Sequence, residues 1–228
     1  MAAKQKVVTK DLHVFENIVS FNEKLKAYLE ENARLIIAIA LIVCLAVGAV
    51  AYWTISSRAS AQTAQSILNQ ALTTMSAVRK TEAEQTAALS SAITELSLAV
   101  ENYSRTEAGR AALFYRAQCK SRQKDYSGAI ADYTDFLKYN GLIVDQLRPV
   151  AFENIGYAHE ALGDSAEALK WFEKAVQAGR NEALVGMARM HEAAGSKELA
   201  CECYQKYLAD TDTVYRDIVE MKIGEVCR

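Results

Sequence analysis

The side chains that could do chemistry in this sequence are two of its three histidines and its five cysteines. His159 and His191 each follow a small residue, Gly156 and Ala188, by three positions. If these segments are equivalent units of a repeat, the two imidazoles lie on neighbouring helices, where a pair of them could hold a metal ion. No carboxylate or thiol occurs at a matching spacing to complete such a site. The sequence therefore favours a packing role for both histidines, in positions that suit a tyrosine.

Other catalytic signatures are missing from the sequence. It has no glycine-rich phosphate loop, no nucleophile motif around a serine or cysteine, and no HExxH pair. Acidic residues such as Glu153, Glu160 and Glu192 are expected on a solvated or partner-facing surface rather than in catalytic pairs. The 26 basic and 28 acidic residues give a net charge of −2. The chain therefore lacks the excess of positive charge that is typical of nucleic-acid-binding proteins. We therefore expect a protein that is not an enzyme, with no cofactor, no metal and no small-molecule substrate.

Four of the cysteines follow a long apolar run and would reach an oxidising compartment if that part of the chain is exported. They are Cys119, Cys201, Cys203 and Cys227. Cys201 and Cys203 are two residues apart on a predicted helix and point to different faces, so we do not expect them to bond to each other. The sequence assigns no other pairing, and buried free thiols are an equal alternative.

The apolar run is uncharged from Leu35 to Trp53. As a helix, these nineteen residues span about 28 Å, close to the roughly 30 Å hydrocarbon core of a bilayer. Three basic residues lie close before the run and one lies close after it: Lys24, Lys26 and Arg34, then Arg58. Because positive charge stays on the cytoplasmic side, the N-terminus should be cytoplasmic and the C-terminal domain exported. A cleaved signal peptide is the alternative, since Ala49-Val50-Ala51 resembles a cleavage site, but the run is long for one.

An internal repeat of helix pairs follows this run. In three segments a small residue precedes Ala-x3-aromatic by twelve positions. The small residues are Ala117, Gly156 and Ala188, and the second parts are Ala129–Tyr133, Ala168–Phe172 and Ala200–Tyr204. Helices pack closely where side chains are small, and the aromatic ring fills the gap towards the next pair. The pattern is typical of tetratricopeptide repeats, which are helix pairs of about 34 residues.

Further residues refine this repeat. Gly163 and Gly195 lie seven positions after the small residue, where the turn inside each pair is expected. Arg116 and Lys120 occupy positions that are normally apolar, so the first complete repeat should pack loosely. Uneven spacing of the equivalent alanines is assigned to loops, above all residues 140–147. The expected core residues are Phe152, Ile155, Phe172, Ala175, Leu184, Met187, Tyr204 and Tyr207, and a final helix at 213–227 should cap the stack through Val214, Ile218, Met221 and Ile223.

The chain is thus expected to be all-α, with an N-terminal transmembrane helix followed by a tetratricopeptide-repeat α-solenoid. Residues 1–33 form a cytoplasmic segment, and residues 34–54 form the anchor. Residues 55–107 form a degenerate first helical hairpin, with Thr81 as a helix cap, and residues 108–228 hold the repeats and the capping helix. An apolar stripe predicts an amphipathic helix in the cytoplasmic segment, with a loosely ordered tail as the alternative: Val14, Ile18, Phe21, Leu25 and Tyr28.

Any binding function of the repeats should lie on their concave face, which the first helix of each pair forms. Counting along the repeat gives a candidate peptide-binding groove that mixes apolar, aromatic and charged groups. Its residues are Phe114, Gln118, Glu153, Tyr157, Glu160, Val185, Arg189 and Glu192. The alternative is that these side chains form an ordinary exposed helix face.

The order of these features resembles the ancillary SecYEG translocon subunit (YfgM-like) family of single-pass inner-membrane proteins. The resemblance includes the amphipathic segment, Glu31-Asn32 at the start of the span, Tyr52-Trp53 at its end, the repeats, and a terminal Glu220-Met221-Lys222-Ile223. It implies a membrane-anchored scaffold that binds Sec translocon subunits and links exported chains to periplasmic chaperones, including a prolyl-isomerase-like partner. The alternatives are a cell-envelope scaffold for division or wall assembly, and an envelope metal or thiol protein.

Overall fold

The computed structural model describes residues 23–26, 28–77, 81–209 and 215–228, and the elements in these ranges are α-helices. Contacts divide the chain into two compact units, Met1–Ser57 and Arg58–Arg228. The predicted all-α class is confirmed. Most of the predicted cytoplasmic stripe (Val14, Ile18 and Phe21) lies outside the described residues, and so does Val214 of the expected cap.

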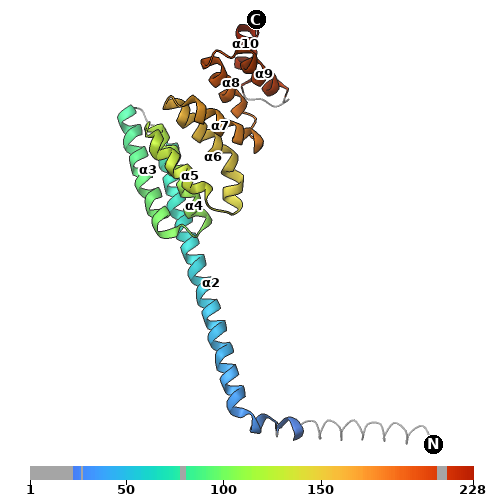
Figure 1. The fold of residues 1–228 in the computed structure, drawn as a ribbon. Coiled ribbons are helices and arrows are strands. Elements are labelled where there is room, and N and C mark those ends of the chain that lie inside the picture. The colour runs from blue at the N-terminus through green and yellow to red at the C-terminus, as the bar shows by residue number, and fades with distance from the viewer. Residues whose placement is uncertain (1–22, 27, 78–80, 210–214) are drawn as a thin grey trace, which may run out of the picture. The chain divides into compact units, whose positions relative to one another are not determined.

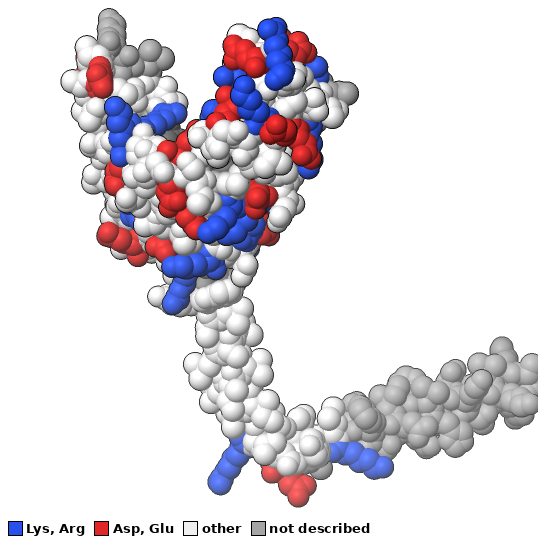
Figure 2. Space-filling view, turned by 45° about the horizontal axis from the view of Figure 1, so that its top comes forward, with Lys and Arg blue, Asp and Glu red and all other residues white. Residues whose placement is uncertain are grey.

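The first unit contains the beginning of α2 (Ala33–Ser76), which is long and apolar enough to cross a membrane. Apolar side chains point outward all around this part of the helix, and Leu45 and Trp53 are 73% and 69% exposed. Figure 2 shows this stretch of the helix without charged atoms on the face in view, whereas Lys, Arg, Asp and Glu are spread over the second unit. Helices of this kind are stable in lipid because every backbone group is paired inside the helix.

The second unit is a stack of helix pairs (Figure 1). After the last turns of α2 come α3 (Glu82–Tyr103), α4 (Glu107–Arg122), α5 (Tyr126–Leu137), α6 (Leu142–Ala161), α7 (Ser165–Gln177), α8 (Ala183–Ala193), α9 (Lys197–Leu208) and α10 (Arg216–Val226). From α3 onward each helix packs against the next, and α4, α6 and α8 also contact one another in succession. The predicted pairs are therefore α4–α5, α6–α7 and α8–α9, and neighbouring pairs share their apolar faces as in a solenoid.

The ends of these helices follow from local sequence. Thr81 caps α3, and its side chain accepts the Glu84 N–H while the Glu84 carboxylate accepts the Thr81 N–H, which forms a capping box. The turns inside the second and third pairs use Gly163 and Gly195 at φ 79° and 75°, as predicted. The equivalent residue of the first pair is Lys124, at φ 65°.

The core combines the expected small and aromatic residues. Ile155, Phe172, Ala175, Leu184, Tyr204 and Tyr207 are buried, and Phe152 and Met187 pack against them with partial exposure. The capping helix differs from the prediction, because Val219 and Val226 are its buried residues while Ile218 and Met221 are 55% and 58% exposed. Residues 142–147 are also not a loop. They lengthen α6 at its start, so the uneven repeat spacing lies in a helix.

The prediction that the first complete repeat packs loosely is wrong. Asp132 on α5, which is 4% exposed, accepts two hydrogen bonds from Arg116, at 2.8 and 2.7 Å. Lys120 lies 2.8 Å from the same carboxylate. Because Asp132 pairs with both cations, the free-energy cost of burying Arg116 and Lys120 is offset. Their long side chains fill the space between α4 and α5.

Candidate functional site

The eight predicted groove residues do lie on α4, α6 and α8, but they meet different environments. Phe114 is 2% exposed, and its ring packs against the rings of Tyr133 and Phe136, with centroids 5.4 and 5.6 Å away. It is a core residue, and its assignment to the groove is wrong. Four of the other residues form a connected polar network on α6 and α8: Glu153, Tyr157, Glu160 and Arg189.

Arg189 on α8 is the centre of this network. Its guanidinium donates from Nε and Nη2 to the two carboxylate oxygens of Glu160 on α6, at 2.8 and 2.7 Å. The same group lies over the ring of Tyr157, 5.5 Å from the centroid. The hydrogen bonds to Glu160 raise the pKa of Arg189 above its ordinary value, so it stays charged. Two successive repeats are thereby joined by a bidentate ion pair that holds Arg189 in one orientation.

Glu153 lies beneath this surface and positions its neighbours. It is 4% exposed and accepts hydrogen bonds from Arg180 Nε at 2.7 Å and from the Tyr157 hydroxyl at 3.1 Å. Burial first, and then the charge of Glu153, raise the pKa of Tyr157 well above its ordinary value. The hydroxyl therefore stays protonated and donates to Glu153. A partner cannot reach this carboxylate, which fixes the ring of Tyr157 instead.

A cavity of about 500 Å³ opens between α8, α9 and α10. Its lining is mainly apolar, with a few charged groups: Val185, Arg189, Glu192, Ala193, Tyr204, Ile218, Val219 and Lys222. Glu192 accepts a hydrogen bond from the Tyr204 hydroxyl, and Lys222 Nζ lies 3.4 Å from the same carboxylate. The size is that of sites for small molecules or large side chains, which are mostly apolar with a few placed polar groups. Gln118, half-buried on α4, belongs to neither the network nor this lining.

Three of the predicted groove residues line the cavity. The helix α10 contributes further lining residues that the prediction did not include. Val185, Arg189 and Glu192 were predicted because they lie on the first helix of a pair. Ile218 and Lys222 come from the capping helix, where Ile218 was expected in the core. The sequence does carry a signal, because α10 has two apolar stripes, and one helix cannot bury both against a single neighbour.

The histidines singled out in the sequence lie on α6 and α8 as expected. His159 Nδ1 lies 3.6 Å from Asp164 Oδ2, at the turn between α6 and α7, and both histidines are half-buried. Among the residues that the structure describes, no group of three or more His, Cys, Asp or Glu side chains is arranged to hold a metal ion.

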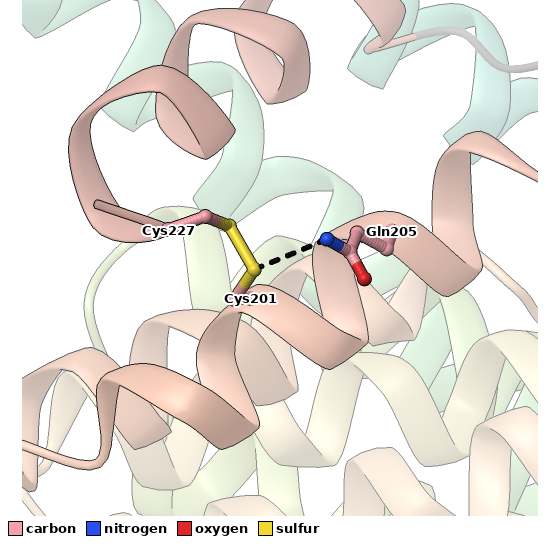
Figure 3. The surroundings of a disulfide bond; sticks show 3 residues. All are labelled: Cys201, Gln205 and Cys227. Carbon is pink, nitrogen blue, oxygen red and sulfur yellow. Dashed lines mark hydrogen bonds between the residues drawn. A yellow bond between two sulfur atoms is a disulfide. The ribbon is translucent and has the colours of Figure 1, made fainter.

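The cysteines divide into one disulfide and three free thiols among the described residues. Cys201 on α9 is bonded to Cys227, directly after α10 (Figure 3). Cys44, Cys119 and Cys203 are free, and Cys119 is fully buried. Burial raises the pKa of Cys203, and raises that of Cys119 to about 11. Neither of these two thiols is therefore a ready nucleophile.

Comparison with known proteins agrees with this architecture. The model of the tetratricopeptide repeat-like domain family matches residues 26–227, a range that includes both the apolar run and the repeats. Comparison with curated protein sequences gives no significant match.

Among solved structures, a tetratricopeptide repeat protein from Parabacteroides merdae is similar, with a TM-score of 0.55 and 16% identity. The match covers 72% of this chain and 60% of that protein's length. PilF from Pseudomonas aeruginosa (TM-score 0.49, 20% identity, 75% of this chain and 83% of that one) and MamA (TM-score 0.48, 15% identity, 74% and 89%) are also similar. At these identities the likeness concerns the fold alone.

Proposed function

The chain belongs to the tetratricopeptide repeat-like domain family, and from that premise we propose that it is a non-enzymatic, membrane-anchored scaffold that binds other proteins. The observation that carries the proposal is the cavity of about 500 Å³ on the last repeat, whose mainly apolar lining includes the charged side chains of Arg189, Glu192 and Lys222. Such a cavity fits an apolar anchor side chain of a partner segment, while these charged groups fix its orientation.

The network beside the cavity supports this role. Arg189 is held by Glu160 and Tyr157, so one wall of the cavity is rigid before a partner arrives. A site that is ordered in advance loses less side-chain entropy on binding. Tyr157 and Glu160 extend the surface from α8 onto α6, where a longer segment would continue.

The apolar part of α2 supports a role at a membrane. Its outward apolar side chains are stable only in an apolar surrounding such as a bilayer. The family match includes this run, and this favours a retained anchor over a cleaved signal peptide. The excess of basic residues before the run favours a cytoplasmic N-terminus and a periplasmic C-terminal domain. The compartment implied is the bacterial inner membrane, with the repeats on its outer side.

The specific partner follows from the resemblance described above. An ancillary subunit of the SecYEG translocon would hold the repeats beside the export channel and hand emerging chains to periplasmic chaperones. Anchoring there raises the effective concentration of the binding surface towards chains leaving the channel. No reaction is catalysed in this mechanism.

Site-specific photo-crosslinking in intact membranes tests the proposal. A photoreactive residue replaces Ile218, which is 55% exposed at the cavity, or Leu142, which is 71% exposed at the start of α6 and does not line the cavity. We expect Sec channel subunits and chaperones among the products from position 218 and not from position 142. Division or wall-synthesis proteins in their place would overturn the Sec assignment, and equal products from both positions would overturn the binding surface.

Protease accessibility tests the orientation separately. Protease added to intact spheroplasts should digest the repeats, because the proposal places them outside the membrane. Repeats that are digested only after lysis would reverse the topology.

A further inference from the structure

The helix α10 forms one wall of the cavity and is largely exposed. It contributes Ile218, Val219 and Lys222 to the lining. Only two of its eleven residues, Val219 and Val226, are buried. Helices of this length are marginal on their own, so α10 depends on its attachment to α9.

Some of the polar contacts at the start and middle of α10 are long. The Tyr215 N–H donates to the Tyr207 hydroxyl at 3.0 Å, whereas Arg216 reaches the Leu208 carbonyl at 3.5 Å. Lys222 lies 3.4 Å from Glu192 on α8. The two longer contacts contribute little to holding a terminal helix.

The far end of α10 is fastened covalently. Cys227, directly after the last residue of the helix, is bonded to Cys201 on α9, and the two cysteines are 26 residues apart in sequence. Gln205 donates a hydrogen bond to the Cys201 sulfur at 3.3 Å (Figure 3). Cys227 is exposed, so a reductant can approach the bond from solvent.

We propose that the Cys201–Cys227 disulfide is a redox-controlled latch that keeps α10 over the cavity. A dithiol reductant transfers two electrons and two protons to the bond, which gives two cysteine thiols and leaves the reductant as a disulfide. Without the covalent tie α10 detaches, and the cavity loses Ile218, Val219 and Lys222. The inference rests on the proposed function, because it describes the regulation of that same binding surface.

The third cysteine of this region does not interfere with the latch. Cys203 is half-buried on α9 beside Cys201, and burial raises the pKa of its thiol. Because Cys201 and Cys203 are two positions apart on α9, their side chains point to different faces and Cys203 is poorly placed to attack the disulfide. The bond therefore opens and closes between the same two residues, and Cys203 can serve as a control position.

Hydrogen exchange of the full chain in detergent, with and without dithiothreitol, tests the latch. We expect reduction to raise the exchange rates of residues 215–228 by about tenfold or more, with unchanged rates in α4 to α7. Cys227→Ser should show the fast pattern under both conditions. Cys203→Ser should behave as the natural chain does.

Two outcomes would overturn the latch. One is slow exchange of residues 215–228 after mass spectrometry has shown that the bond is reduced. The other is faster exchange throughout α4 to α7 as well, because the disulfide would then stabilise the whole stack. Hydrogen exchange needs no binding partner, so it tests the latch separately from the binding function. Missing crosslinks at Ile218 in the oxidised protein would count against the binding function and would leave the latch unaffected.

Discussion

The ring of Phe172 on α7 occupies the space that a side chain on Gly156 would need. A Cβ on Gly156 would lie 2.6 Å from Cδ1 of this ring, and a Cβ on Gly186 of α8 would lie 2.7 Å from its Cε1. Phe172 is fully buried, so it has no room to move away. One aromatic side chain thus sets the distance between two successive repeats. The ring fits there because Gly156 and Gly186 have no side chains that would occupy the same space.

Replacing either glycine by alanine should destabilise the stack. The new methyl group forces the ring or the backbone to shift at a cost of about 1–3 kcal/mol, which the better helix propensity of alanine offsets by up to about 1 kcal/mol. We expect Gly156→Ala and Gly186→Ala to lower the urea midpoint of the protein in detergent. Gly224→Ala is the matched control, because nothing lies within 4 Å of a Cβ there. Equal midpoints for all three variants would show that the ring adapts.

The turn between α4 and α5 contains strain that the later repeats avoid. Lys124 has φ 65°, where the other two turns have glycine, and its side chain is exposed. The left-handed conformation costs a residue with a side chain about 1–2 kcal/mol, while glycine costs about 0.5–1 kcal/mol through the entropy of the unfolded chain. We therefore expect Lys124→Gly to stabilise the protein by roughly 0.5–1 kcal/mol in urea unfolding.

The reverse change supplies the control for this turn. Gly163→Lys introduces the same strain into the second pair, where φ is 79° and a Cβ meets no neighbour within 4 Å. It should lower stability through backbone strain alone. A gain from Gly163→Lys, or a loss from Lys124→Gly, would mean that side-chain contacts rather than φ decide the preference.

Asp132 is expected to be the most sensitive ion-pair partner in the first complete repeat. Asp132→Ala leaves Arg116 and Lys120 side by side, with 16% and 22% of their side chains exposed. Removing one partner from a buried ion pair costs about 3 kcal/mol or more. Asp135→Ala removes a carboxylate that is 54% exposed and paired with Lys138, and it should change stability by less than about 0.5 kcal/mol. Similar urea midpoints for the two variants would contradict a structural role for Asp132.

Much of the fold could be predicted because the repeat is recorded in local spacing. The small residue and the Ala-x3-aromatic motif describe where two helices touch, and the structure places Phe172 and Tyr204 at those contacts. Gly163 and Gly195 likewise mark turns whose backbone favours glycine. These signals work because each one depends on neighbours within a single helix pair.

The remaining features depend on pairing between helices, which spacing does not record. Arg116 looks misplaced in the core of α4 until Asp132 on α5 is seen beside it, sixteen residues along the chain. Ile218 was predicted in the core because the sequence does not say which of the two apolar stripes of α10 faces α9. The partner of Cys201 was open for the same reason.

The buried thiol of Cys119 should make the fold sensitive to alkali. Burial raises its pKa from 9.0 to about 11, because the thiolate is poorly solvated inside the stack. A thiol whose pKa is higher in the folded state stabilises the fold fully below the unfolded value, and this contribution is lost as the pH rises towards the folded value. The free energy of unfolding should therefore fall between about pH 9 and pH 11, by up to about 2 kcal/mol from this group.

Cys119→Ala isolates this effect, because alanine cannot ionise. Both proteins should carry Cys44→Ser and Cys203→Ser, so that no other free thiol of the described residues can exchange with the disulfide. We expect urea midpoints of the Cys119 protein to fall more steeply with pH across this range than those of the alanine variant. Burial also raises the pKa of Tyr133 and Tyr204 well above the ordinary value, so both stay neutral in the folded protein across this range, although the charge of Cys119 contributes to the rise at Tyr133. Parallel pH profiles would show that Cys119 ionises as easily in the folded chain as in the unfolded one.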